Sequence, residues 1–275
     1  MNERHQAAPK SSRTGHYSAP AAACAADLLI AFGRAAQPQS LSELTRTTGV
    51  SKSLAFRVLR ELESRELVTR GEDGRFTLGV SALELAGSYL QLSGLGTLAR
   101  GVLRDLASES GDTADLAVLR GAEILYVMKE EGPHAYPTIS HVGKRLPANC
   151  SALGKVLLSK LDDKEIVARF AGSYPQLTPK SASSWEELKP MIEEAHTLDY
   201  AVNMGEAISG RGYVASAVHI GTEWAAIGVS ANESSFRESQ VELIASLRRA
   251  RERVARELAA RASFVSEEPE LIVSS

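Results

Sequence analysis

The hydrophobic positions between residues 50 and 64 repeat with the period of an α-helix. At 100° per residue, five apolar side chains fall on one face of such a helix: Leu54, Ala55, Val58, Leu59 and Leu62. The opposite face carries a different set of side chains: Ser53, Phe56, Arg57, Arg60 and Ser64. Ser51 stands at the N-cap position, where its hydroxyl can accept a hydrogen bond from a free backbone N–H. A helix that packs by one side and is cationic on the other suits the major groove of DNA.

The residues before this helix favour a helix-turn-helix. Ser40 and Glu43 have the spacing of a capping box, which predicts a short helix over 41–48. Gly49 can adopt the left-handed conformation that ends a helix, and Val50 can fill the gap between the two helices. A short helix, a glycine turn and a capped second helix together form a helix-turn-helix.

The residues around this pair of helices predict a winged helix. Residues 21–32 form a further apolar helical pattern, and strand patterns at 67–70 and 75–78 flank a Gly-Glu-Asp-Gly turn, which predicts a β-hairpin. Arg70 and Arg75, at the hairpin, are placed to contact phosphate or a minor groove. The side chains that we expect to contact DNA are Ser51, Lys52, Ser53, Phe56, Arg57, Arg60, Arg70 and Arg75.

The rest of the chain has the pattern of a mixed domain. Residues 79–94 predict a helix that is apolar around much of its surface and therefore needs a partner, either its own second domain or another copy of the chain. We expect further helices at 95–108, 151–161, 163–171, 185–198 and 237–261. The expected strands are 115–120, 123–128, 138–142, 213–220 and 225–230. Helices interleaved with hairpin-connected strands indicate an α/β (α+β) fold with an antiparallel sheet.

This pattern divides the chain into five segments. They are a disordered tail (1–18), a winged helix-turn-helix DNA-binding domain (19–78), a linker helix (79–94), a second domain (95–262) and a flexible tail (263–275). Positive charge is concentrated in the N-terminal part: residues 1–80 hold 11 Lys and Arg against 8 Asp and Glu, whereas the remainder has a net charge of −6. This asymmetry favours contact between the winged helix and phosphate. The acidic residues within 61–73 leave a second hypothesis, a winged helix that serves as a protein-docking adaptor.

Composition and cysteine usage exclude several classes of protein. With 44% hydrophobic and 24% charged residues, the chain has the composition of a globular protein. Its two cysteines lie far apart, no His or Cys spacing typical of a metal site occurs, and no apolar run approaches the roughly 20 residues that span a bilayer. We therefore expect a cytoplasmic protein with no cofactor, no metal and no membrane partner.

An enzyme is the third hypothesis, because Cys150 beside Ser151 at a helix start could be an activated thiol. Such a thiol needs a base. The candidate histidines, none of which has a recognised spacing from the cysteine, are His134, His141, His196 and His219. A phosphate-binding loop is also absent from the sequence. We therefore predict no catalytic residues.

The order of these parts resembles the IclR family of bacterial transcriptional regulators over nearly the whole chain. Three stretches carry the resemblance: 51–59 (SKSLAFRVL) with the following Leu67-Val68, 145–158 (RLPANCSALGKVLL), and 199–230, which includes the strand patterns around 215–218 and 226–230. The resemblance implies a GAF-like C-terminal domain that binds a small effector, usually an organic acid. It also implies dimers formed through the DNA-binding domains and the linker, often paired into tetramers. The expected partners are thus a double-stranded DNA operator, a small carboxylate and further copies of the chain.

The resemblance also nominates residues for the effector pocket. Carried over by position, they are Met128, Ser151, Ala152, Leu153, Asn203, Tyr213 and Ser230. The chain departs from the family at Asn203, where many members have an acidic residue, and at Tyr213, where cysteine is common. Ser151 would cap a helix whose first N–H groups favour a carboxylate, although a purely structural cap is the alternative. Tyr213 could equally be a core residue.

Overall fold

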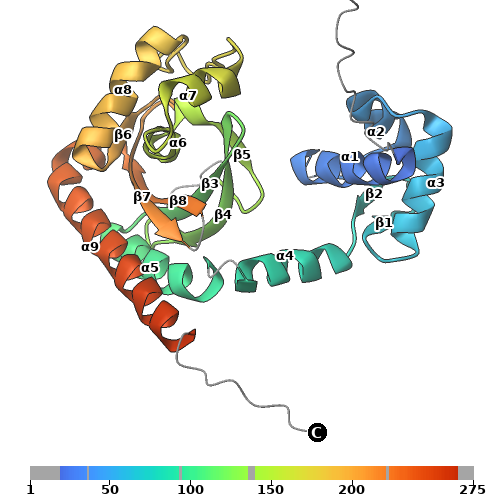
Figure 1. Ribbon diagram of the computed structural model, residues 1–275, viewed down its shortest axis with the longest axis horizontal. Coiled ribbons are helices and arrows are strands. Elements are labelled where there is room, and N and C mark those ends of the chain that lie inside the picture. Colours follow the sequence, from blue (N-terminus) through green and yellow to red (C-terminus); the bar gives the residue numbers. More distant parts are fainter. Residues whose placement is uncertain (1–18, 36, 93–94, 136–139, 221–222, 266–275) are drawn as a thin grey trace, which may run out of the picture. The chain divides into compact units, whose positions relative to one another are not determined.

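The computed structural model describes residues 19–35, 37–92, 95–135, 140–220 and 223–265 (Figure 1). The chain forms two compact units, Met1–Ala82 and Leu83–Ser275. The predicted tail 1–18 lies outside the described residues, as do residues 266–275 of the predicted C-terminal tail.

The first unit is the winged helix predicted from the sequence. Its helices are α1 (Pro20–Ala35), α2 (Leu41–Thr48) and α3 (Lys52–Glu63), and they are followed by the strands β1 (Val68–Arg70) and β2 (Phe76–Leu78). The two strands pair antiparallel as the predicted hairpin. Apolar side chains from all five elements form one core, which includes Leu28, Leu44, Leu59, Val68 and Phe76. Burial of these side chains fixes the orientation of α3, because its inner face must meet this core.

The ends of α2 follow the sequence closely. The Ser40 backbone N–H donates to Glu43 Oε2 at 2.7 Å, and the Glu43 backbone N–H donates to Ser40 Oγ at 3.2 Å, so the predicted capping box is formed. Gly49 ends the helix in the left-handed conformation, with φ of 72°.

The start of α3 differs from the prediction. Ser51 occupies its N-cap in an extended conformation, but the Ser51 side chain makes no capping hydrogen bond, so the predicted use of that hydroxyl as a cap is wrong.

The helix α4 (Ser81–Leu92) begins at the end of the first unit and continues into the second, where α5 (Leu95–Ser110) follows it. Within the described residues the strands of the second unit form a six-stranded antiparallel sheet in the order β5-β4-β3-β8-β7-β6. The strands are β3 (Thr113–Arg120), β4 (Glu123–Glu131), β5 (Arg145–Pro147), β6 (Ala201–Met204), β7 (Arg211–Ile220) and β8 (Glu223–Asn232). The remaining helices are the short 3-10 helix η1 (Ala148–Cys150), α6 (Ala152–Leu158), α7 (Asp163–Phe170), α8 (Trp185–Leu198) and α9 (Glu233–Val265).

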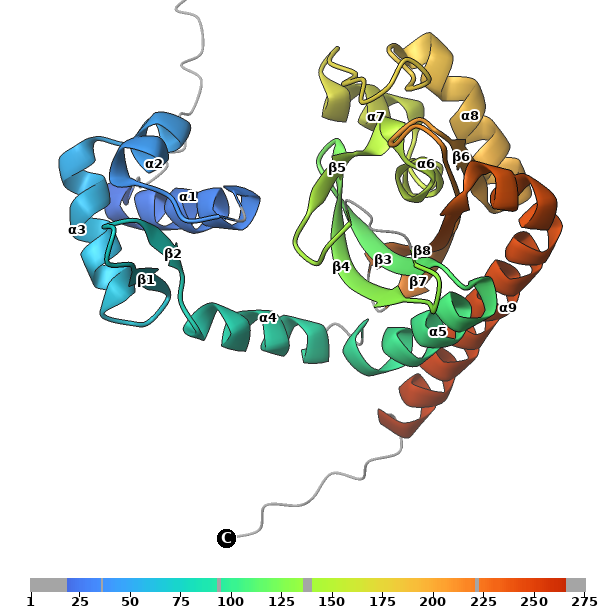
Figure 2. The same cartoon turned by 180° about the vertical axis from the view of Figure 1, so that it is seen from behind.

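Two hydrophobic cores lie on the two faces of this sheet. One is formed with α5 and α9, and the other with α6, α7 and α8 (Figures 1 and 2). Alternate residues of each strand therefore serve different cores, as expected for a sheet covered on both sides. Across the described residues, no helix combines the length and the apolar composition needed to cross a lipid bilayer.

The sequence patterns misplaced several elements of this unit. Of the strand predicted at 138–142, residues 138 and 139 lie outside the described residues. Val142 and Gly143 form a turn, in which the Gly143 N–H donates to Tyr126 O at 2.8 Å. The edge strand is β5 instead. The four-residue strand β6 was not predicted, and α6 ends at Leu158, earlier than expected. These elements are short, so their local patterns carry little information.

A β-bulge in β4 changes which side chains face which core. Leu116 pairs with Met128 and Ala117 pairs with Tyr126, so Val127 is the extra residue on the bulged strand. Tyr126 therefore packs into the core on the α6 side, whereas Met128 packs into the core with α5 and α9. Without the bulge, residues two apart on a strand would share a face.

The capping box predicts a local effect of Ser40. Ser40→Ala should lower the protection of the α2 amides against hydrogen exchange by about 1 kcal/mol, because the Glu43 N–H loses its acceptor. Ser42→Ala is the matched control, since the Ser42 side chain is exposed on the same helix. Amide hydrogen exchange of the full chain measures both variants. Equal protection of α2 in both would show that this cap contributes nothing.

Candidate functional site

The outer face of α3 is open to solvent. Its exposed side chains are Lys52, Ser53, Phe56, Arg57 and Arg60, and the exposed Ser51 precedes them. Arg57 has no salt-bridge partner in the described part of the chain, and Arg60 lies 4.0 Å from Glu63 in a solvent-exposed contact. Phe56 is 42% exposed, which is unusual for a large apolar ring. The face thus presents exposed cationic groups and one aromatic ring, as the sequence indicated.

The two arginines of the wing differ in their surroundings. The Arg70 guanidinium lies over the Phe76 ring, 5.5 Å from its centroid, and is otherwise open. Arg75 Nη1 instead donates to Glu43 Oε2 at 3.0 Å and to Pro38 O at 3.1 Å. These bonds fasten the wing to the start of α2, so a phosphate would have to compete for Arg75. The sequence did not reveal this pairing.

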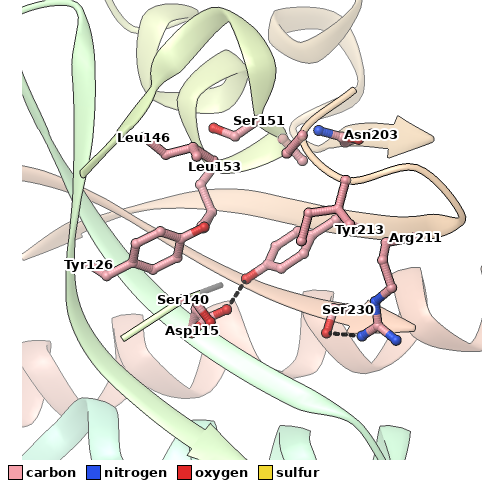
Figure 3. Close-up of a pocket in the computed structure, with 13 residues that line it drawn as sticks. Asp115, Tyr126, Ser140, Leu146, Ser151, Leu153, Asn203, Arg211, Tyr213 and Ser230 are labelled. Carbon is pink, nitrogen blue, oxygen red and sulfur yellow. Dashed lines mark hydrogen bonds between the residues drawn. The ribbon is translucent and has the colours of Figure 1, made fainter. Parts of the chain in front are cut away.

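The second unit contains a cavity between the sheet and the start of α6 (Figure 3). Six of the seven predicted effector residues line it: Ser151, Ala152, Leu153, Asn203, Tyr213 and Ser230. Met128 does not line it, because the bulge turns this side chain toward α5 and α9, so its predicted place in the pocket is wrong. The lining residues that sequence reasoning missed are Asp115, Tyr126, Ser140, Leu146, Ala207, Ile208 and Arg211.

One wall of the cavity is the junction between η1 and α6. Ser151 Oγ accepts a hydrogen bond from the Gly154 N–H at 2.9 Å, so Ser151 caps α6 as predicted. Asn203 Nδ2 donates to Cys150 O at 2.7 Å, while Asn203 Oδ1 accepts from the Glu206 N–H at 2.9 Å. An ionised acid at position 203 could accept the second bond but could not donate the first. The amide therefore suits the position structurally.

The opposite wall contains a buried acid, Asp115 on β3. Asp115 is 1% exposed, and its Oδ2 accepts a hydrogen bond from the Tyr213 hydroxyl at 3.0 Å (Figure 3). Burial raises the pKa of Asp115 to about 7, against the opposing effects of hydrogen bonds from Tyr213 and Ser140 and of nearby Lys129. Burial also raises the pKa of the Tyr213 phenol well above its usual value, so Tyr213 stays protonated and donates.

The cavity's arginine is already paired. Arg211 Nη2 donates to Asp112 Oδ1 and Oδ2 at 2.9 and 2.8 Å and to Ser230 Oγ at 2.9 Å, and Arg211 Nη1 donates to Asn232 Oδ1 at 2.9 Å. Because Asp112 balances its charge, Arg211 does not supply a free cation to the cavity. In Figure 3, Ser151 and Asn203 lie at one end of the cavity, and Asp115 and Ser230 lie at the other.

Both units match models of one protein family. Residues 87–256 match the family described as bacterial transcriptional regulator IclR C-terminal, and residues 21–72 match the IclR helix-turn-helix domain. The chain belongs to the IclR family. It is therefore an IclR-type DNA-binding transcriptional regulator with a C-terminal effector-binding domain, and not an enzyme. This assignment decides against the docking adaptor and the thiol enzyme considered above.

Individual proteins agree with this IclR assignment. The chain is 29% identical over 188 residues to the HTH-type transcriptional regulator XynR of Escherichia coli K12. The matched residues cover 68% of this chain and 75% of XynR. A solved IclR transcriptional regulator from Alicyclobacillus acidocaldarius is 26% identical, with a TM-score of 0.77 over 86% of this chain and 98% of that one. An IclR homologue from Microbacterium hydrocarbonoxydans, solved in complex with 4-hydroxybenzoate, shares the fold at 22% identity, with a TM-score of 0.74 over 87% of this chain and 99% of that one.

A buried ion pair lies behind the cavity wall of this IclR-family domain. Lys155 Nζ donates to Glu206 Oε1 and Oε2 at 2.7 and 2.9 Å and to Val202 O at 2.8 Å. The side chains of Lys155 and Glu206 are 3% and 9% exposed. Burial raises the pKa of Glu206, and the positive charge of Lys155 opposes that shift. Because the Glu206 N–H also bonds Asn203, the pair and the cavity wall form one network.

Cys150 has no feature of a reactive thiol. It is fully buried, its Sγ donates to Pro175 O at 3.1 Å, and burial raises the pKa of the thiol. Among the described residues, no group of three or more His, Cys, Asp or Glu side chains is arranged to hold a metal ion. The side chains that line the cavity offer hydrogen-bonding groups and apolar contact to a ligand.

The ion pair gives a stability prediction. Glu206→Leu alone should destabilise the effector domain by roughly 3–5 kcal/mol, because it leaves Lys155 buried without its counter-charge. The double variant Lys155→Met/Glu206→Leu should recover most of that loss, since no charge then remains buried. Thermal unfolding of the full chain measures both. Lys189→Met, which breaks an exposed pair with Asp163, is the control and should change little. A double variant as unstable as the single one would show that the unpaired lysine is not the cause of the loss.

Proposed function

We propose that α3 reads an operator in the major groove and that a small organic acid in the cavity controls operator affinity. The observation that carries the first part is the outer face of α3, where exposed Arg57 has no salt-bridge partner among the described residues. An unpaired guanidinium can bind guanine O6 and N7 or a phosphate without first breaking a bond in the protein. The other proposed contacts from this helix are Ser51, Lys52, Ser53, Phe56 and Arg60.

The wing has a supporting role in this proposal. Arg70, stacked on the Phe76 ring, can reach phosphate, whereas Arg75 does so only by exchanging its bonds to Glu43 and Pro38. Glu72 and Asp73 are exposed at the tip of the wing, where their negative charge repels the DNA backbone. We therefore expect sequence recognition by α3 and backbone contacts by the base of the wing.

The effector proposal rests on how polarity is distributed in the cavity. Apolar side chains form much of the lining, with polar groups at the two ends, as in many small-molecule sites. Asp115 disfavours an anion at its own end, so the effector's carboxylate should lie at the opposite end, near Ser151 and Asn203. The complex of the Microbacterium hydrocarbonoxydans homologue with 4-hydroxybenzoate makes an aromatic acid a reasonable first probe. Tyr126 and Tyr213 could flank such a ring.

We further propose that the regulator acts as a dimer or a tetramer. The helix α4 has no buried side chain, and large apolar side chains are exposed along it and just before it: Val80, Leu83, Leu85, Tyr89 and Leu92. A second copy of the chain is the partner that matches this surface, because two winged helices could then bind the two halves of an imperfect palindrome. Effector control would follow if the ligand binds two arrangements of the dimer with different affinities.

Operator binding should depend on Arg57. Arg57→Ala should weaken binding to the DNA upstream of the protein's own gene by on the order of 1–3 kcal/mol while leaving the fold intact, because the side chain is exposed. Arg237→Ala is the matched control, since it removes one positive charge from an exposed arginine of the other unit. Fluorescence anisotropy at fixed salt measures both affinities. If both variants bind as tightly as the wild type, α3 is not the reading helix.

Assembly should depend on the apolar face of α4. Leu83→Glu should shift the protein toward the monomer. Leu83 is 71% exposed in the single chain and would be buried in the proposed dimer, where a charge is unfavourable. Ser88→Glu adds the same charge at an exposed polar position of the same helix and should leave assembly unchanged. Light scattering at micromolar concentration distinguishes the states. A monomeric wild type at that concentration would overturn the proposed dimer.

A further inference from the structure

Asp115 combines deep burial with an unsatisfied acceptor at the cavity. Its Oδ2 is bonded by the Tyr213 hydroxyl, but its Oδ1 has no hydrogen-bond partner within the described residues. Asp115 lines the cavity (Figure 3). Buried polar atoms in native proteins almost always have a partner, so an orphaned carboxylate oxygen at a cavity wall calls for an explanation. A ligand group in the cavity would provide one.

No positive charge in the described structure is paired with Asp115. From β4, Tyr126 and Lys129 face it, but the Lys129 Nζ lies 2.7 Å from Glu131. From β7, Tyr213 faces it with a neutral hydroxyl. Asp112, just before β3, adds a like charge nearby, and the nearby Ser140 hydroxyl lowers the pKa of Asp115 while Oδ1 stays without a hydrogen-bond partner among the described residues. The Arg211 guanidinium donates to both carboxylate oxygens of Asp112. The charges around Asp115 therefore favour a ligand that places a hydrogen-bond donor beside this carboxyl group and disfavour a ligand that places an anion there.

We propose that Asp115 is a donor-recognition subsite, in which Oδ1 accepts a hydrogen bond from a hydroxyl or amino group at the end of the effector remote from its carboxylate. This inference rests on the proposed effector function of the cavity. The effector is then a hydroxy or amino acid rather than a plain carboxylic acid. A site built around a hydrogen bond rejects the analogue that lacks the group, because the protein's buried partner is left unpaired.

The neighbouring residues hold Asp115 ready for this bond. The Tyr213 hydroxyl occupies Oδ2 and so directs the remaining acceptor capacity to Oδ1. Tyr213 can lie there because residue 228 is glycine: a Cβ at Gly228 would come within 2.5 Å of the Tyr213 ring. Position 228 also pairs with Asp115 in the sheet. Asp115 on β3, Gly228 on β8 and Tyr213 on β7 thus contact one another across three neighbouring strands.

The subsite also predicts how affinity depends on pH. The pKa of Asp115 is raised to about 7, and a ligand donor favours the ionised form. Binding of a donor-bearing acid should therefore strengthen by up to about tenfold between pH 6 and pH 8, relative to the same acid without the donor. A plain carboxylate should weaken over this range, since ionised Asp115 repels it.

The experiment compares matched acids on the full chain by calorimetry. Hydroxybenzoates and aminobenzoates are paired with benzoate, and hydroxy or amino aliphatic acids are paired with their plain analogues. The effect of a hydroxyl donor on affinity is thus measured separately from that of an amino donor. The donor-bearing member of the best-binding pair should bind the wild type at least tenfold more tightly. Asp115→Leu, of similar size but apolar, should abolish that preference. Asp115→Asn should abolish the dependence on pH, because an amide does not titrate.

The wild-type pH series needs no variant and keeps the test decisive if a variant fails to fold. Acids that bind the wild type with no preference for the donor, or with a preference that Asp115→Leu retains, would overturn the subsite and leave the effector proposal standing. If no acid in any arm binds, the effector proposal fails, and the subsite that rests on it fails as well.

Discussion

The buried amide of Asn203 holds the cavity wall together. Its Nδ2 bonds the Cys150 carbonyl at the start of α6, and its Oδ1 bonds the Glu206 N–H, so one side chain joins β6 to the η1–α6 junction. The Lys155–Glu206 pair anchors the same loop from behind. At Gly154, a Cβ would lie 2.1 Å from Ala148 O, so only glycine allows the helix to start this close to η1. These contacts hold the start of α6, which carries the lining residues Ala152 and Leu153.

This construction suits a sensor better than a catalyst. The cavity is lined by groups that bind reversibly, and the network behind it connects the lining to α6, β6 and the loop that carries Glu206. A ligand that contacts Asn203 or Ser151 therefore acts on a connected set of bonds rather than on one side chain. For that to regulate transcription, the ligand must distinguish two arrangements of the protein, since equal affinity for both shifts neither.

Local sequence patterns predicted most of the helices and strands, whereas side-chain pairings between residues far apart in the sequence were missed. The winged helix could be predicted because the capping box of α2, the turn glycine and the apolar spacing of α3 all lie within a few residues of one another. The family resemblance nominated seven cavity residues, of which six line the cavity. Met128 does not, because a bulge at Val127 shifts the register of β4 and no local signal marks it. Arg75 was expected at phosphate, and its bond to Glu43 spans 32 positions. Lys155 and Glu206 are 51 apart, so only the fold brings them together.

Affinity measured in both directions tests most directly whether the acid in the cavity and the operator on α3 are coupled. The operator Kd is determined by anisotropy with and without saturating acid, and the acid Kd by calorimetry with and without saturating operator. Linkage requires both ratios to be equal, so a tenfold change in one predicts a tenfold change in the other. An acid that binds the cavity and leaves operator affinity unchanged would contradict the account.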